Sequence, residues 1–282
     1  MIKIIECPRD AMQGLRDFIP TEQKTAYINQ LLKAGFDTID FGSFVSPKAI
    51  PQMRDTAEVL AGLRKSKTKL LAIVANERGA QDAAAFSAID YLGYPFSISE
   101  TFQLRNTNAT IEESMTRVER IQQICRESGK QMVLYISMGF GNPYGDPWNV
   151  DIARRWVDRL IALDIRIFQL SDTIGVANPD NIHYLFSHLI PQYEGIEFGA
   201  HFHTQPHNWR EKVEAAYDAG CRRYDGAIKG FGGCPMAKDD LTGNMPTENL
   251  LFYFHSLKVD TGVKKPVFRK AMEMAQAVFP HD

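Results

Sequence analysis

Eight short apolar runs alternate along the chain with amphipathic runs, and this alternation is the feature that most limits the fold. The apolar runs have the length of strands, and the amphipathic runs have the spacing of helices. Strands that alternate with helices form a parallel sheet, and eight such units favour a closed (β/α)8 TIM barrel over an open sheet. The strand-like runs are residues 2–6, 36–41, 70–74, 88–92, 131–137, 165–170, 196–200 and 222–227.

The helical runs carry stop signals that support the same α/β barrel. Three of them end in a small residue followed by glycine, at Gly35, Gly129 and Gly220, and each glycine leads into a strand-like run. An eighth helix is expected to begin near Thr247, and Pro266 fits the first turn of an additional C-terminal helix. No linker or low-complexity segment divides the chain, so residues 1–282 are expected to form a single barrel domain with a C-terminal extension. Helices are expected at residues 21–34, 53–64, 79–86, 111–128, 148–163, 179–189 and 209–219.

Composition narrows the class of partner. The formal net charge is −2, which gives no electrostatic reason to expect binding to nucleic acid or to an anionic membrane surface. No uninterrupted apolar run approaches the length of about 18 residues expected of a membrane-spanning helix. The four cysteines lack C-x-x-C spacing, so neither a zinc knuckle nor a disulfide framework is expected, and a reduced, cytoplasmic setting is the default.

His201 and His203 lie two residues apart at the end of the seventh strand-like run. Alternate side chains of a strand point to the same face, so both imidazoles are expected on one face. Two imidazoles alone do not define a metal site, but the active sites of such barrels lie at the carboxyl ends of the strands. Asp10 follows the first strand and belongs on the same rim. One carboxylate and two imidazoles predict a divalent metal, with Mg²⁺ or Mn²⁺ favoured over Zn²⁺.

Three further charged residues end strands on this rim: Arg9, Asp40 and Asp172. For either acid alone, a helix cap or a buried ion pair explains the position as well as a functional role does. Cys234 lies in the glycine-rich stretch Gly230-Phe231-Gly232-Gly233-Cys234-Pro235. The glycines suit a mobile loop, and a thiol near a metal and an arginine is suited to proton transfer, although a packing role is equally consistent. Asn244 follows Gly243, and position alone favours a turn asparagine over a ligand.

Six stretches, in this order along nearly the whole chain, resemble the 3-hydroxy-3-methylglutaryl-CoA lyase family, within the metallolyase superfamily of TIM barrels. They are Pro8-Arg9-Asp10 with Gln13, Ser43-Phe44-Val45-Ser46-Pro47-Lys48 with Pro51-Gln52-Met53, Asp172-Thr173-Ile174-Gly175-Val176, His201-x-His203, residues 230–235, and Gly243-Asn244 with Thr247-Glu248. The order of these stretches is specific for the superfamily, and the second and fifth stretches are similar to the lyase branch.

The resemblance implies a role for each of these residues. The metal ligands of the family fall on four residues: Asp10, His201, His203 and Asn244. Its polar catalytic positions fall on five residues: Arg9, Asp40, Asp172, Cys234 and Glu248. The implied activity is a metal-dependent carbon–carbon lyase that cleaves 3-hydroxy-3-methylglutaryl-CoA to acetyl-CoA and acetoacetate. Arg9 would stabilise the enolate and Cys234 would protonate it, while Asp40, Asp172 and His201 remain alternatives for the base.

Four departures from the family leave the acyl substrate open. The family has Glu where this chain has Asp40, and it usually has Asp where this chain has Thr204. The first motif continues Ala11-Met12-Gln13-Gly14 where the family has Gly-Leu-Gln-Asn, and the stretch 236–241 before Asn244 is longer than its family counterpart by about one residue. The alternatives are another metal-dependent aldolase or acyl lyase acting on a related hydroxy acid, or a barrel that binds a metal or thioester without catalysis. The expected partner is a small-molecule acyl-CoA or hydroxy acid, and the oligomeric state is left between monomer and homodimer.

Overall fold

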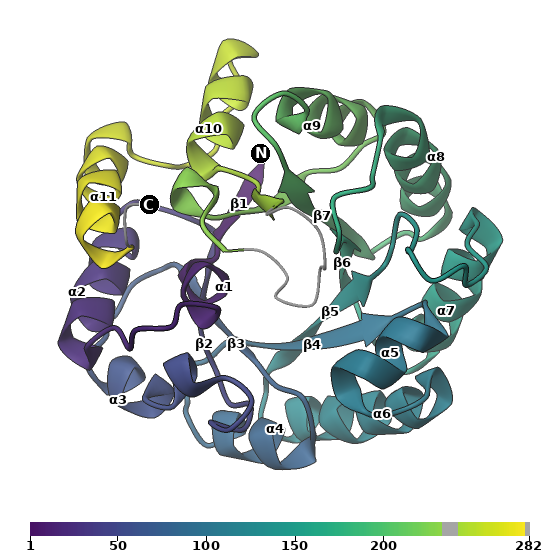
Figure 1. The fold of residues 1–282 in the computed structure, drawn as a ribbon, viewed down its shortest axis with the longest axis horizontal. Coiled ribbons are helices and arrows are strands. Elements are labelled where there is room, and N and C mark those ends of the chain that lie inside the picture. Colours follow the sequence, from purple (N-terminus) through teal and green to yellow (C-terminus); the bar gives the residue numbers. More distant parts are fainter. Residues whose placement is uncertain (233–241, 280–282) are drawn as a thin grey trace.

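In the computed structural model, which describes residues 1–232 and 242–279, eight parallel strands form a closed barrel with helices around it (Figure 1). Neighbouring strands pair in chain order from β1 to β6, β8 pairs with both β1 and β7, and the β6–β7 pairing closes the ring. The predicted fold class is therefore confirmed. The strands are β1 (Lys3–Glu6), β2 (Thr38–Ser43), β3 (Lys69–Ile73), β4 (Tyr91–Ser97), β5 (Gln131–Ser137), β6 (Ile167–Asp172), β7 (Glu197–Thr204) and β8 (Arg223–Gly226).

Helices form the outer layer, and the additional C-terminal helix is confirmed as α11, which lies beside α2 (Figure 1). Phe279, just after α11, packs edge-on against Tyr27 of α2, with ring centroids 5.9 Å apart. The helices are α1 (Pro8–Gln13), α2 (Thr21–Leu31), α3 (Thr56–Ala61), α4 (Glu77–Ala84), α5 (Glu100–Thr107), α6 (Ile111–Glu127), α7 (Val150–Ala162), α8 (Pro179–Leu189), α9 (Trp209–Asp218), α10 (Thr247–Ser256) and α11 (Lys265–Val278). The short 3-10 turns are η1 (Pro51–Met53), η2 (Ile190–Gln192) and η3 (Ile228–Gly230), and the two-residue strand β9 (Gly243–Asn244) pairs antiparallel with β7.

The structure corrects the sequence interpretation at four places. The strand expected at 88–92 begins at Tyr91 and continues to Ser97. Its second half was missed because proline usually interrupts strands, and Pro95 lies inside β4. The loop expected after Cys7 is the short helix α1, with Pro8 at a position where a missing N–H costs nothing. The single helix expected at 53–64 is η1 followed by α3, and helix α5 was not expected at all.

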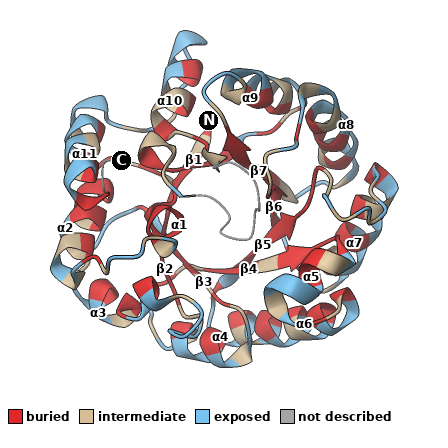
Figure 2. Cartoon of the chain, in the orientation of Figure 1, coloured by how far each residue is buried: buried red, intermediate tan, exposed pale blue. Residues whose placement is uncertain are grey.

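The barrel strands are largely buried (Figure 2), and the buried apolar side chains form two separate clusters. Most buried apolar side chains lie between the strands and the helices. A smaller cluster of Leu71, Val133, Tyr135 and Ile167 fills the barrel interior from β3, β5 and β6. Much of the interior side of β7 and β8 carries polar side chains instead, and the candidate site lies at their carboxyl ends.

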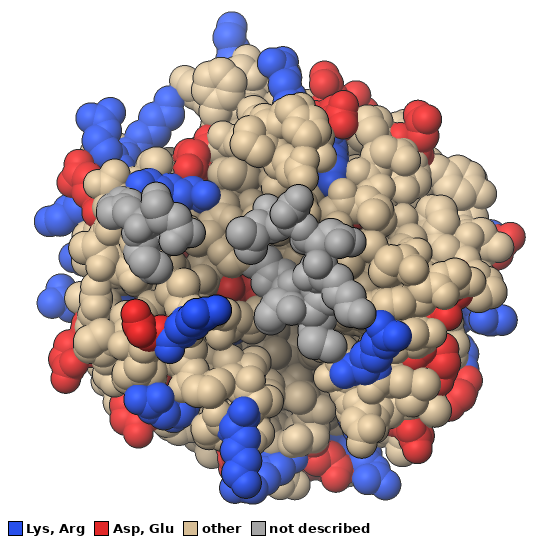
Figure 3. Space-filling model, in the orientation of Figure 1, with Lys and Arg blue, Asp and Glu red and all other residues tan. Residues whose placement is uncertain are grey.

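The surface over this end of the barrel carries charges of both signs, with Lys and Arg interspersed among Asp and Glu (Figure 3). This distribution agrees with the formal net charge of −2. Among the described residues, no helix combines the length and the apolar character that crossing a membrane requires.

Candidate metal centre and active site

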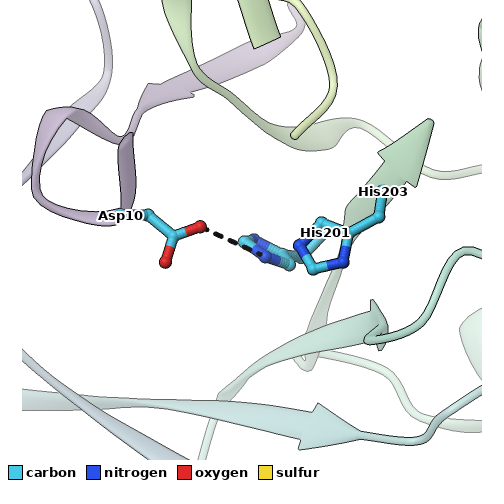
Figure 4. Close-up of side chains that lie close together, drawn as sticks. All are labelled: Asp10, His201 and His203. Carbon is cyan, nitrogen blue, oxygen red and sulfur yellow. Dashed lines mark ion pairs between the residues drawn. The ribbon is translucent and has the colours of Figure 1, made fainter. Parts of the chain in front are cut away.

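Asp10, His201 and His203 converge at the carboxyl end of the barrel (Figure 4). Asp10 projects from the first turn of α1, and the two histidines project from the same face of β7. One ligand atom from each of the three residues lies within 4.8 Å of the others, and His201 Nε2 is 4.0 Å from an oxygen of Asp10. This is the convergence that the strand-end rule predicted for these residues.

Each histidine is oriented by a hydrogen bond from its other ring nitrogen. His201 Nδ1 lies 2.9 Å from Asp225 Oδ2, and His203 Nδ1 lies 2.9 Å from the carbonyl oxygen of Thr173. Both partners are acceptors, so each Nδ1 carries the proton and each Nε2 keeps its lone pair. Metal-binding histidines are held by carboxylates and carbonyls in this way, so the donor set fits a divalent metal.

Asn244 reaches this centre through β9, where it lies opposite His203 in the register with β7. Its Nδ2 donates to the carbonyl of Phe231 at 2.9 Å, and its side chain also hydrogen bonds the carboxylate of Asp10. The structure therefore brings all four predicted ligands to one place, although the ligand role of Asn244 stays a prediction.

Arg9 connects Asp10, a predicted metal ligand, to Asp40. Its Nε and Nη2 atoms hold the carboxylate of Asp40 from two sides, with Nε 3.0 Å from Oδ2. Its Nη1 donates to Asp10 Oδ1 and to Gln13 Oε1, both at 2.9 Å. Burial raises the pKa of Asp40 to about 6, although the charge of Arg9 acts to lower it. The guanidinium is thus fixed in a rigid geometry with one face on the cavity.

The electrostatic environment favours the ligand forms of Asp10 and His203, whereas the environment of His201 favours its protonated form. Burial opposes ionisation of Asp10, but the charges of Arg9, His201 and His203 outweigh it and lower the pKa of Asp10. Burial and the neighbouring His201 lower the pKa of His203. Burial also disfavours a charged His201, but the hydrogen bond and charge of Asp225 raise its pKa overall. An ionised carboxylate and a neutral imidazole are the states that metal binding requires.

A cavity of about 390 Å³ opens beside these ligands, within the usual size range of small-molecule sites. Its polar lining residues include Arg9, Asp10, Gln13, His201 and His203. Its apolar lining residues include Val45, Ile50, Ile73, Ala75 and Phe102. The cavity can therefore hold a molecule with a metal-chelating polar end and an apolar portion.

Two predicted catalytic residues, Asp172 and Glu248, lie outside the cavity. Both carboxylate oxygens of Asp172 are bound elsewhere, one by Lys212 Nζ at 2.7 Å and one by the backbone N–H of Ala177 at 2.9 Å. Glu248 accepts the backbone N–H of Lys229 at 3.0 Å and does not line the cavity among the described residues. Cys234 lies outside the described residues, so its catalytic role stays a prediction.

Two neighbours of the predicted site were missed by sequence reasoning. Asp225 orients His201 from β8, and Gln13 donates to Asp10 Oδ1 while accepting from Arg9. Asp225 lies next to the last residue of β8, so the strand-end rule that selected Asp10 could have selected Asp225 as well. Gln13 lies three residues after Asp10, which places both on one face of a helix, but α1 was expected to be a loop.

The family model described as HMGL-like matches residues 2–276. The chain belongs to the HMGL-like family. Among related HMGL-like proteins, the cytoplasmic 3-hydroxy-3-methylglutaryl-CoA lyase of Danio rerio is 32% identical over 93% of this chain and 78% of its own length. A 3-hydroxy-3-isohexenylglutaryl-CoA/hydroxymethylglutaryl-CoA lyase of Pseudomonas aeruginosa is 31% identical over 93% of this chain and 87% of its own length.

The structural comparison agrees with this HMGL-like assignment. A solved lyase for 3-hydroxy-3-methylglutaryl-CoA from Acinetobacter baumannii, in complex with coenzyme A and 3-methylmalate, superposes with a TM-score of 0.93. The two chains are 31% identical, and the match covers 100% of this chain and 92% of the other. The resemblance stated from the sequence is thereby confirmed.

Proposed function

We propose that this protein is a divalent-metal-dependent carbon–carbon lyase that cleaves 3-hydroxy-3-methylglutaryl-CoA to acetyl-CoA and acetoacetate. The observation that carries the proposal is the convergence of two oriented imidazoles and one carboxylate beside a buried arginine in a cavity. The names of the relatives supply the substrate. The mixed oxygen and nitrogen donors favour Mg²⁺ or Mn²⁺.

The proposed reaction is a retro-Claisen cleavage of the substrate. When bound, the metal supplies Lewis-acid polarisation of the substrate oxygens. A base takes the proton of the 3-hydroxyl group, the bond between carbons 2 and 3 breaks, and the electron pair moves onto the thioester as an enolate. Arg9 lies on the cavity wall and stabilises this negative charge. Cys234 then gives a proton to the enolate carbon, which yields acetyl-CoA.

The base is proposed from the three alternatives. Asp40 has a pKa raised to about 6, which is a suitable value for a base at neutral pH. It is fully buried and, among the described residues, reaches the cavity only through its contact with Arg9. His201 directs its Nε2 toward the metal site, and Asp172 is occupied by Lys212. We therefore favour Asp40, with Asp172 and Glu248 supporting the surrounding backbone.

The apolar residues that line the cavity favour a second candidate substrate. Val45, Ile50, Ile73 and Phe102 can surround a substituent longer than methyl on carbon 3. The Pseudomonas aeruginosa relative is named for an isohexenyl substrate of that kind. The second candidate function is therefore cleavage of a 3-hydroxyglutaryl-CoA that bears a longer apolar chain. In both cases the partner is an acyl-CoA, the proposed location is the cytoplasm, and a homodimer is compatible with the site.

The direct test is to incubate the purified protein with Mg²⁺ or Mn²⁺ and each of the two thioesters. Acetoacetate from 3-hydroxy-3-methylglutaryl-CoA, lost on chelation and regained on metal addition, supports the first candidate. Cleavage of the isohexenyl thioester alone supports the second. Product formation that is unaffected by complete chelation contradicts the metal-dependent mechanism, and the absence of product from either thioester favours a non-catalytic barrel.

The role of Cys234 has a separate test. Cys234→Ala is expected to abolish turnover and to leave Mn²⁺ binding intact, because the thiol is the proposed proton donor and not a ligand. Cys125→Ala is the matched control, since Cys125 is buried in α6. Wild-type turnover in Cys234→Ala would remove the thiol from the mechanism.

A further inference from the structure

A polar contact crosses the barrel interior directly beneath the metal centre. Gln169 of β6 and Asp225 of β8 are both buried, and Gln169 Nε2 donates to Asp225 Oδ1. The other oxygen of Asp225 is the acceptor for His201 Nδ1. Gln169 is thus two hydrogen bonds away from His201 without contacting any predicted metal ligand itself.

The contact joins strands that are not neighbours, because β7 lies between β6 and β8 (Figure 1). Gln169 lies beside Gly199 of β7 in the strand register. A Cβ atom on residue 199 would lie 1.7 Å from Gln169 Oε1, which is far inside any permitted contact. The absence of a side chain at Gly199 therefore lets the Gln169 amide pass over β7 and reach Asp225.

The side chain of Arg223 lies near the amide of Gln169 without a hydrogen bond between them, since among the described residues neither Gln169 Oε1 nor any guanidinium nitrogen of Arg223 has a hydrogen-bond partner. This arginine is 1% exposed, and its Cδ would lie 3.0 Å from the same Cβ position on residue 199, so its side chain lies beside the amide. A carboxylate only accepts hydrogen bonds, so the amide nitrogen of Gln169 faces Asp225. The amide oxygen lies on the side of Arg223.

Arg223 also has electrostatic reasons to stay charged inside the barrel. Its Nη1 lies 3.6 Å from Asp37 Oδ1 and 3.5 Å from Glu197 Oε1. Burial disfavours the charge, but Glu197 and the other nearby anionic groups raise the pKa of Arg223 overall. A permanent positive charge therefore lies next to the Gln169 amide.

We propose that Gln169 is a positioning residue for the metal centre. This role rests on the metal site of the proposed function. By holding one oxygen of Asp225, it keeps the other oxygen on His201 Nδ1. The proton of His201 then stays on Nδ1, and the lone pair of Nε2 faces the metal. His203 does not depend on this contact, because its Nδ1 donates to the backbone carbonyl of Thr173.

The proposal is tested with Gln169→Met, which keeps the approximate length of the side chain and removes its hydrogen bonds. The first measurement is ¹⁵N NMR of the histidine rings in the metal-free protein, with signals assigned from His201→Asn and His203→Asn. The His201 signals are expected to move toward those of mixed tautomers, while the His203 signals stay in place. The second measurement is Mn²⁺ affinity, which is expected to fall about tenfold, the lower end of the range for outer partners of a ligand.

Gln122→Met is the matched control, because Gln122 on α6 also uses its Nε2 for one buried contact, with the carbonyl of Asp164 at 3.0 Å. This variant loses a comparable hydrogen bond far from the metal centre. It is expected to keep wild-type histidine signals and wild-type Mn²⁺ affinity. An equal change in both variants would mean that Gln169 has only a general structural role, and the proposal would be overturned.

A second variant keeps the test decisive if Gln169→Met does not fold. Gly199→Ala displaces the same amide from above and is expected to give the same His201 shift and the same loss of affinity. Unchanged His201 signals in whichever variant folds would overturn the proposal. Failure of the wild-type protein to bind Mn²⁺ would count against the proposed function instead, while the metal-free NMR measurement would still decide the role of Gln169.

Discussion

Asp40 lies within β2 and Asp172 ends β6, and each is buried beside a buried cation, yet their surroundings differ. Asp40 is held by Arg9, which also contacts Asp10 and faces the cavity. Asp172 is held by Lys212 of α9, whose Nζ also donates to the carbonyl oxygen of His203 at 2.9 Å. One ion pair borders the reaction site, and the other ties a strand to the helix layer.

Strand alternation accounts for the difference. Ser171 and Thr173 line the cavity, so Asp172 between them points to the opposite face of β6, toward α9. A carboxylate at the carboxyl end of a barrel strand is therefore a catalytic candidate only if its side chain also faces inward. The location of the paired cation, on the cavity wall for Arg9 and in the helix layer for Lys212, then distinguishes a functional ion pair from a structural one.

Removing the cation from the Asp172–Lys212 pair should give the largest effect. Lys212 is 1% exposed and its ion pair is sealed from water, so Lys212→Met leaves Asp172 as an uncompensated buried charge. We expect a loss of about 3–5 kcal/mol in the free energy of unfolding, measured by urea denaturation. Adding Asp172→Asn to this variant should recover about half of the loss, because no unpaired charge remains. A loss in Lys212→Met no larger than that of a surface substitution would contradict the buried pairing.

Removing the cation from the pair at the cavity should affect turnover more than stability. Arg9→Met is expected to lower kcat by about 10²–10³-fold, the effect of deleting a donor that stabilises an oxyanion. Mn²⁺ binding should persist, because Arg9 is not a ligand. Arg9→Lys is the matched control, since it restores the charge but not the paired donation from Nε and Nη2 to Asp40. Its kcat should lie between those of the wild-type protein and Arg9→Met. Wild-type kcat in Arg9→Met would remove Arg9 from the chemistry.

Glu6 extends the comparison to a buried carboxyl group held by neutral donors. Its oxygens contact the hydroxyl of Thr247 and the backbone N–H of Ile228, and burial raises its pKa to about 8. The folded protein therefore binds a proton that the unfolded chain releases near its ordinary pKa. The stabilising contribution is complete at acidic pH and is lost as pH rises toward 8.

The fall in stability with rising pH can be tested with Glu6→Gln, whose side chain keeps the shape of a protonated glutamate and stays neutral at every pH. Between pH 6 and 7.5, the wild-type protein should lose about 2 kcal/mol of unfolding free energy relative to this variant, at about 1.4 kcal/mol per pH unit. Urea denaturation at the two pH values measures the difference. Parallel pH dependence of the two proteins would show that Glu6 is already ionised in the folded state.

The fold was predictable because the strand–helix alternation repeats along the whole chain and each error stayed local. Pro95 concealed the second half of β4, and α5 has only two large apolar residues, Phe102 and Leu104, whose spacing of two is not helical. Those errors left the order of the elements intact. Strand order in a barrel then fixes which residues share the rim.

The metal triad was predictable for the same reason, whereas its supporting contacts were not. Asn244 reaches His203 through a strand of two residues, which is too short to leave a sequence pattern. The inward direction of Gln169 and the outward direction of Asp172 also leave no pattern, because barrel strands are buried on both faces. Only the structure distinguishes the two directions.

The smallest predicted effect separates the two acids most sharply. Asp40→Asn removes the proposed base and should lower kcat by about 10²-fold or more. Asp172→Asn should leave kcat within about threefold of wild type, or less than about 1 kcal/mol in the barrier, because its carboxylate is bound by Lys212 and Ala177 outside the cavity. Both variants are assayed for acetoacetate under conditions where each is folded. If Asp172→Asn loses as much kcat as Asp40→Asn, then Asp172 is catalytic, as the family resemblance implied, and the ion pair with Lys212 must open during turnover.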